Sequence, residues 1–183
     1  MNLLDRVKMI LLAPRSEWPA IGREAGKPSA LFARYVAVLA LIPALGRFIG
    51  ASLVGGYAPI ALSLIGALIS YLASFAIVYI LALVIDALAP AFGAQRNFAR
   101  ALKLAAYSCT PVWLAGIFLI VPGLSFLVVL GLQGAYLLWT GLPILMRAPA
   151  ERALPYAAVV TGCALVVLIG VGAITAPFFK APG

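Results

Sequence analysis

Asp86 is the first candidate for chemistry in this sequence, because it is the only acidic residue beside a long apolar run. A carboxyl group near hydrocarbon is costly, which makes it a functional candidate by default. Arg96, Arg100 and Lys103 follow within a few turns of helix. Two interpretations stay open: an ion pair with one of these cations at the membrane surface, or a proton- or cation-sensing carboxylate that faces an internal cavity.

The three cations themselves form a second candidate site. Arg96, Arg100 and Lys103 recur at helical spacing, with Tyr107 one turn further on. Such a stripe would hold the phosphate of an anionic lipid headgroup at the cytoplasmic face. The general preference for basic residues on that face explains the same pattern without any ligand.

Polar side chains in the middle of apolar runs form a third candidate. An unsatisfied amide or hydroxyl is costly in hydrocarbon, so we expect these side chains to bond to one another and join the helices, or else to line a polar substrate path. The set is Ser70, Tyr71, Ser74, Thr110, Gln133 and Tyr136. Arg47 lies deep in the first apolar run with no acidic residue at the same depth, and we expect it to snorkel outward.

An enzyme is the least supported class. The chain has no histidine and only five acidic residues, which removes the commonest general base and the commonest metal ligand. Cys109 and Cys163 lie far apart in apolar runs, which is typical of packing residues. We therefore expect no catalytic residues, no metal and no cofactor.

The elements that must position these residues are membrane helices. Of the 183 residues, 65% are hydrophobic and 10% are charged, whereas soluble domains have roughly 45–50% and about 25%. A span needs about 20 apolar residues. The sequence predicts an all-α membrane protein with five spans, at about 31–54, 60–83, 102–121, 124–145 and 154–176.

Charge predicts the orientation. All 13 lysines and arginines except Arg47 and Lys180 fall on one side of a five-span protein, so the N-terminus is expected in the cytoplasm. This asymmetry explains the net charge of +8, and no nucleic-acid partner is implied. We expect an N-terminal segment over 1–30, a membrane domain over 31–176 and an external tail over 177–183. The N-terminal segment is amphipathic, so it would either lie among lipid headgroups with Trp18 as an anchor or pack beneath the bundle.

Small residues mark sites of close helix packing. Gly46 and Gly50 form a GxxxG pattern in the first span, and Gly66 begins a small-residue stripe with Ser70 and Ser74 in the second. Both patterns suit packing within the bundle and self-association equally. Pro43 and Pro111 are expected to kink their helices.

Several short sequence motifs resemble those of a known family. They are Leu4–Pro14 with Glu17-Trp18, Leu88-Ala89-Pro90 with Phe92-Gly93, Ala106-Tyr107-Ser108 with Thr110–Trp113, Gly134–Leu137 with Gly141-Leu142-Pro143, and Ala153–Tyr156. Together they resemble bacterial members of the Yip family, the Ypt/Rab-interacting membrane proteins. The resemblance implies five membrane helices, a cytosolic N-terminus and a short C-terminus on the far side. Eukaryotic relatives act with Rab GTPases through a long N-terminal region, which is only about thirty residues here, so Rab binding is not expected.

Two functions remain in contention. The first is a scaffold or adaptor in the bacterial inner membrane, which binds other membrane proteins, a second copy of itself, or lipids, anionic lipids included. The alternative is a small transporter or channel for an ion, a proton or a small solute, suggested by Asp86, the kinked helices and the mid-membrane polar residues.

Overall fold

Five long apolar helical segments form the core of the structure, a computed structural model that describes residues 2–24 and 28–180. They are Ser29–Val54, Ile60–Phe92, Phe98–Ile120, Pro122–Leu145 and Ala150–Phe179. Within the described ranges the all-α, five-span prediction is confirmed, and the chain is a multi-pass membrane protein. The second, third and fifth segments begin or end several residues beyond the predicted bounds. Lys27 and the end of the predicted tail, 181–183, lie outside the described residues.

Each of the five segments changes helix type along its length. The first contains α3 (Pro28–Leu31), η1 (Phe32–Val36), α4 (Ala37–Leu39), α5 (Leu41–Phe48) and η2 (Ile49–Val54). The second contains α6 (Ile60–Leu88) and η3 (Ala89–Phe92), and the third α7 (Phe98–Ser108), α8 (Thr110–Ala115) and η4 (Gly116–Ile120). The fourth contains η5 (Pro122–Leu132) and α9 (Gln133–Leu145), and the fifth α10 (Ala150–Thr175) and η6 (Ala176–Phe179). The label η marks the stretches that are not α-helical: η1 and η2 are π-helices and η3 to η6 are 3₁₀-helices.

Two of these interruptions lie next to prolines. The helix stops at Leu39 and resumes at Leu41, and it stops again at Ser108 and resumes at Thr110. Pro43 and Pro111 follow these breaks within three residues. A proline supplies no N–H to the preceding turn and its ring crowds the carbonyl four residues earlier, which accounts for a break at each place.

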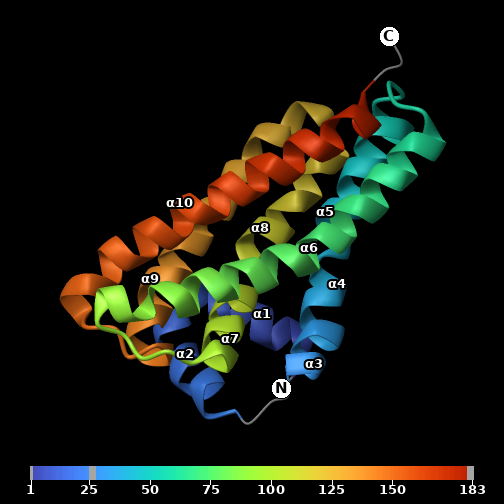
Figure 1. Cartoon of the computed structure of the whole chain (residues 1–183). Helices are drawn as coiled ribbons and strands as arrows, with labels where there is room; N and C mark the ends of the chain where they lie inside the picture. The colour runs from blue at the N-terminus through green and yellow to red at the C-terminus, as the bar shows by residue number, and fades with distance from the viewer. Residues whose placement is uncertain (1, 25–27, 181–183) are drawn as a thin grey trace.

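The bundle has two chemically different ends. One, here called the basic end, carries the connections 93–97 and 146–149 together with α1 (Leu3–Leu12) and α2 (Pro14–Arg23). The other, the far end, carries the connection 55–59 and η6, which lie at the upper right of Figure 1. The positive-inside prediction assigns the basic end to the cytoplasm.

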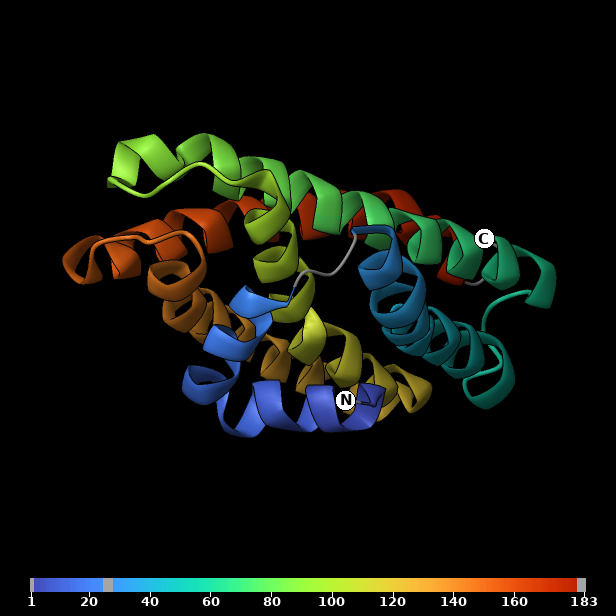
Figure 2. The ribbon, with the colours of Figure 1, turned by 90° about the horizontal axis from the view of Figure 1, so that it is seen from below.

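The N-terminal segment packs on the bundle. Ile10, Trp18 and Ile21 are fully buried, and α2 lies against α9. Figure 2 shows α1 and α2 together on the side of the molecule away from α6. Of the two predicted arrangements, the structure has the packed one for α2. The interpretation of Trp18 as an interfacial anchor is wrong, because its Nε1 donates to Thr140 Oγ1 inside the protein at 3.1 Å.

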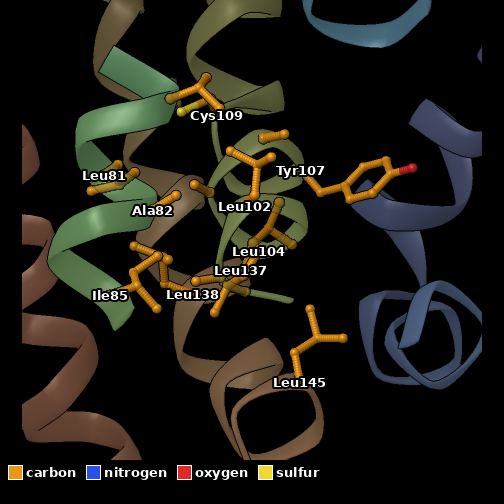
Figure 3. Packing of buried hydrophobic residues seen from close by; sticks show 14 of the residues in the cluster. Leu81, Ala82, Ile85, Leu102, Leu104, Tyr107, Cys109, Leu137, Leu138 and Leu145 are labelled. Atoms are coloured by element: carbon orange, nitrogen blue, oxygen red, sulfur yellow. The ribbon is translucent and has the colours of Figure 1, made fainter. Parts of the chain in front are cut away.

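The dense core lies toward the basic end. Figure 3 shows side chains of α6, α7 and α9 meeting there, among them Leu81, Leu104 and Leu138. A smaller, separate cluster closes the far end and consists of Ala51, Ala58, Ala67 and Phe179. The bundle is thus tightly packed at the basic end and held by a small cluster at the far end.

The predicted small-residue contacts lie within the chain. A Cβ added at Gly46 would lie 2.4 Å from the Gly116 carbonyl oxygen, and one at Gly50 would lie 1.9 Å from that of Leu119. Gly66 likewise meets the side chains of Phe178 and Phe179. These glycines therefore bring α5 and η2 onto η4, and η6 onto α6, and the structure occupies them with internal packing.

Gly50→Ala tests this close approach. The new methyl group would overlap the Leu119 carbonyl, and overpacking of this kind costs about 1–3 kcal/mol. We expect a clearly lower melting temperature in mild detergent. It is measured as the fraction of protein that still elutes as a single size-exclusion peak after heating. The matched control is Gly162→Ala in α10, where an added Cβ meets nothing within 4 Å, and it should melt like the parent. Equal melting of the two variants would contradict the packing described here.

Candidate functional site

A buried ion cluster joins α1 and α2. The Arg6 guanidinium pairs with the carboxylates of Glu17 and Glu24. The Arg6 and Glu17 side chains are only 11% and 7% exposed, so this pair is nearly removed from solvent. A pair of this kind is hard to break one partner at a time, because the remaining charge would stay buried.

Lys103 fastens the same cluster to the bundle. Asn97 caps α7 by accepting a hydrogen bond from the Arg100 N–H at 3.0 Å, which begins the helix that carries Lys103. The Lys103 Nζ donates to the carbonyl oxygens of Ile21 and Glu24 at the end of α2. Carbonyl groups in the last turn of a helix lack partners within that helix, so this lysine caps α2.

An aromatic group lies directly above the cluster. The Arg6 guanidinium is 5.8 Å from the ring centroid of Tyr107, and that ring packs edge-on against Tyr35 at 4.6 Å. The Tyr35 hydroxyl shares a 2.7 Å hydrogen bond with Thr110 Oγ1. Polar contacts therefore continue from the cluster into the third span.

A second ion pair stands at the end of α6. The Nε and Nη2 atoms of Arg96 both donate to Asp86 Oδ2, at 3.1 and 3.0 Å. The Asp86 side chain is 13% exposed and that of Arg96 is 65% exposed. Asp86 Oδ1 is buried and has no hydrogen-bond partner among the described residues.

A cavity of about 460 Å³ lies between α5, α6, α8, η5 and α10. Its lining is mainly apolar, with polar contributions from Arg47, Ser70, Ser74, Ser108 and Thr161. The hydroxyls of Ser108 and Thr161 are buried, and neither has a hydrogen-bond partner within the described chain. Asp86 and Gln133 do not line this cavity.

Arg47 lies at the far end of the cavity. Its Nη1 donates to Thr175 Oγ1 at 3.1 Å, and its guanidinium lies 4.3 Å from the ring centroid of Phe179. Thr175 is itself buried and donates back to the Val171 carbonyl at 2.8 Å. The guanidinium of Arg47 thus contacts residues of α10 and η6 toward the far end.

Comparison with known proteins identifies the family. The Yip1 domain model matches residues 8–171, which is most of the chain. The chain belongs to the Yip1 family. No curated protein and no solved structure matches it.

In this Yip1-family chain the predicted headgroup stripe is divided among internal contacts. Arg96 pairs with Asp86, and Arg100 Nη1 reaches the Leu145 carbonyl at 3.5 Å. Lys103 points to the end of α2. The structure therefore has the ion pair that was one of the two interpretations of Asp86, and the three cations do not share one outward surface.

The mid-membrane polar residues do not bond to one another between helices, contrary to our expectation. Ser70 and Ser74 donate to carbonyl groups within α6, at 2.8 and 3.0 Å. Tyr71 donates to the Ala37 carbonyl at 3.2 Å, and Gln133 Nε2 to the Leu11 carbonyl at 3.3 Å. Thr110 bonds to Tyr35, and Tyr136 packs edge-on against Trp139. Each side chain finds a nearer partner, which is often a backbone carbonyl.

Sequence reasoning missed the Arg6 cluster and the cavity of this Yip1 protein. A signal for the cluster was present, because Glu17, Ile21 and Glu24 follow helical spacing beside Trp18. Carboxylates on the same face as buried apolar residues indicate an internal cation. The cavity had no comparable signal, since its lining comes from every span.

Arg6→Gln tests the buried cluster. Removing one member of a buried pair costs about 3–5 kcal/mol, because Glu17 would remain charged and unpaired. We expect α1 and α2 to detach, seen as rapid proteolysis in that region and a lower melting temperature. Arg15→Gln is the matched control, since Arg15 is exposed on α2 and should leave both readouts unchanged. If the two variants behave alike, the cluster does not hold the N-terminal helices.

Proposed function

We propose that this Yip1-family protein is a non-enzymatic scaffold of the bacterial inner membrane, which holds other membrane proteins at its cytoplasmic face. The observation that carries the proposal is the outer face of α1. Leu4 and Leu12 are 77% and 74% exposed there, although they lie outside the five spans. Exposed apolar surface of this kind is typical of interaction sites.

The arrangement of α1 supports the proposal. Leu4, Lys8 and Leu12 are spaced four residues apart and share one side of the helix. The opposite side is fixed by the fully buried Ile10 and by the pairing of Arg6 with Glu17. A face held in one orientation binds a partner at a lower entropic cost than a mobile segment would.

Membrane lipid is the competing occupant of this face. A helix with leucines beside a lysine also suits the headgroup layer of a bilayer. A scaffold requires protein contacts there, so the identity of what touches Leu4 and Leu12 decides between the two.

We do not propose transport. That alternative was suggested by Asp86, the kinked helices and the mid-membrane polar residues. Ser70 and Ser74 line the cavity, but Asp86 and Gln133 do not, and the lining is mainly apolar. Asp86 is paired with Arg96, and the buried residues Trp113, Leu81 and Leu138 line the cavity on the side of the dense core.

Site-specific photocrosslinking in native membranes tests the scaffold. A benzophenone amino acid at Leu4 or Leu12 should give discrete protein adducts, because these side chains point away from the chain's own core. The control position is Val166 on α10, which is 71% exposed within the fifth span and should contact lipid.

Mass spectrometry of the adducts shows whether protein or lipid contacts this face of α1. Adducts that contain the same protein from both α1 positions, and not from Val166, support the scaffold. Lipid adducts alone at Leu4 and Leu12 contradict it.

A further inference from the structure

We propose that the cavity between η5 and α10 binds an acyl chain of an anionic phospholipid, whose phosphate contacts Arg47. This site lies in the half of the bundle toward the far end, here called the far half. It is independent of the scaffold surface on α1. The ligand is identified by three properties of the cavity: an apolar lining, an opening toward the bilayer and a single cation at one end.

The lining suits a hydrocarbon chain. The cavity of about 460 Å³ lies within the roughly 300–1,000 Å³ range of small-molecule sites. Its walls include Val112 and Trp113 of α8, Leu132 of η5, and Leu165 and Leu168 of α10. Such a surface gives no favourable contacts to an ion or a sugar, whereas methylene groups fill it without loss of hydrogen bonds.

The opening faces the surrounding lipid. Val129 and Leu132 of η5 line the cavity and are 57% and 53% exposed. Leu165 of α10 also lines it and is 41% exposed. The packing partners explain the gap, because α10 lies against α6 and α9 while η5 lies against α8 and η4. A lipid chain would therefore enter sideways between η5 and α10, without crossing the headgroup layer.

Charge selects the headgroup. Arg47 is the only charged residue in the lining, and no acidic residue lines the cavity. Within the described chain its guanidinium donates one hydrogen bond, to Thr175. A charge at this depth is costly without an anion, and a guanidinium matches the geometry of phosphate oxygens. An anionic lipid supplies the missing partner from the membrane itself.

Two hydroxyl groups in the cavity wall have no hydrogen-bond partner within the described chain. Ser108 is 3% exposed, and its hydroxyl has no hydrogen-bond partner among the described residues. The Thr161 hydroxyl is in the same state, and both residues line the cavity. A helical hydroxyl can turn to a carbonyl group of the preceding turn, as the Ser70 hydroxyl does, so these two hydroxyls do not demand a polar ligand.

Gly172 offers a way to close the cavity without disturbing the fold. It lines the cavity, yet a Cβ added there meets nothing within 4 Å. Gly172→Phe would place a ring in the space assigned to the acyl chain. Gly170→Phe is the matched control, because Gly170 also meets nothing within 4 Å and does not line the cavity.

Native mass spectrometry supplies the test. The full chain is reconstituted with equal amounts of phosphatidylglycerol and phosphatidylcholine, transferred to mild detergent, and examined for bound lipid. We expect one bound phospholipid per chain. Phosphatidylglycerol should be preferred by about tenfold, because the choline cation of phosphatidylcholine opposes the attraction between its phosphate and Arg47. Gly172→Phe should lose the bound lipid, and Gly170→Phe should keep it.

The headgroup contact is tested separately. Arg47→Gln should bind the two lipids about equally, whereas Arg47→Lys keeps the charge and should keep the preference. Monodisperse elution of each variant controls for folding. Equal binding of both lipids by the unchanged protein would overturn the assignment of Arg47. Retention of the bound lipid in Gly172→Phe would overturn the assignment of the cavity.

Discussion

Lipid tails are as apolar as leucine, so a membrane bundle cannot close by removing apolar surface from water. Close packing must come from small residues and polar contacts, and the distribution of these decides the shape of this protein. Gly46 and Gly50 let α5 and η2 touch the backbone of η4. Gly172 on α10 lines the cavity, and a Cβ added there would meet nothing within 4 Å. The cavity thus lies beside a glycine that has no packing partner.

The basic end closes by different means. There the pairing of Arg6 with Glu17 joins α1 to α2. The cap that Lys103 forms on α2 and the buried Trp18 join the N-terminal helices to the third and fourth spans. The result is one dense layer with α1 on its surface. The fixed surface of α1 and the lipid-facing cavity lie in different parts of the bundle. The proposed scaffold function and the proposed lipid site can therefore be tested independently.

The sequence predicted the elements better than their contacts. Apolar run length was enough for the five spans, because hydrocarbon thickness sets that length. The predicted second span stopped before Asp86, but the helix continues to Leu88 and η3 to Phe92, since Asp86 is paired with Arg96. Contacts between distant residues had no local signal: Arg47 and Thr175 are 128 positions apart. Basic residues near a membrane surface fit either a lipid-headgroup site or the general preference for cations on the cytoplasmic side. The sequence alone does not show that Lys103 points inward while Arg96 is exposed, because that depends on how the helices pack.

The contrast between a dense end and an open half is the central claim, and oxygen accessibility of spin labels in liposomes tests it most directly. Oxygen concentrates in hydrocarbon, so a label reports whether lipid tails reach it. Leu168 faces the cavity and Ile169 is 70% exposed on the outside of α10. Our account predicts high and similar accessibility for labels at these two positions. A label at Leu168 as shielded as one at the fully buried Leu104 would contradict it.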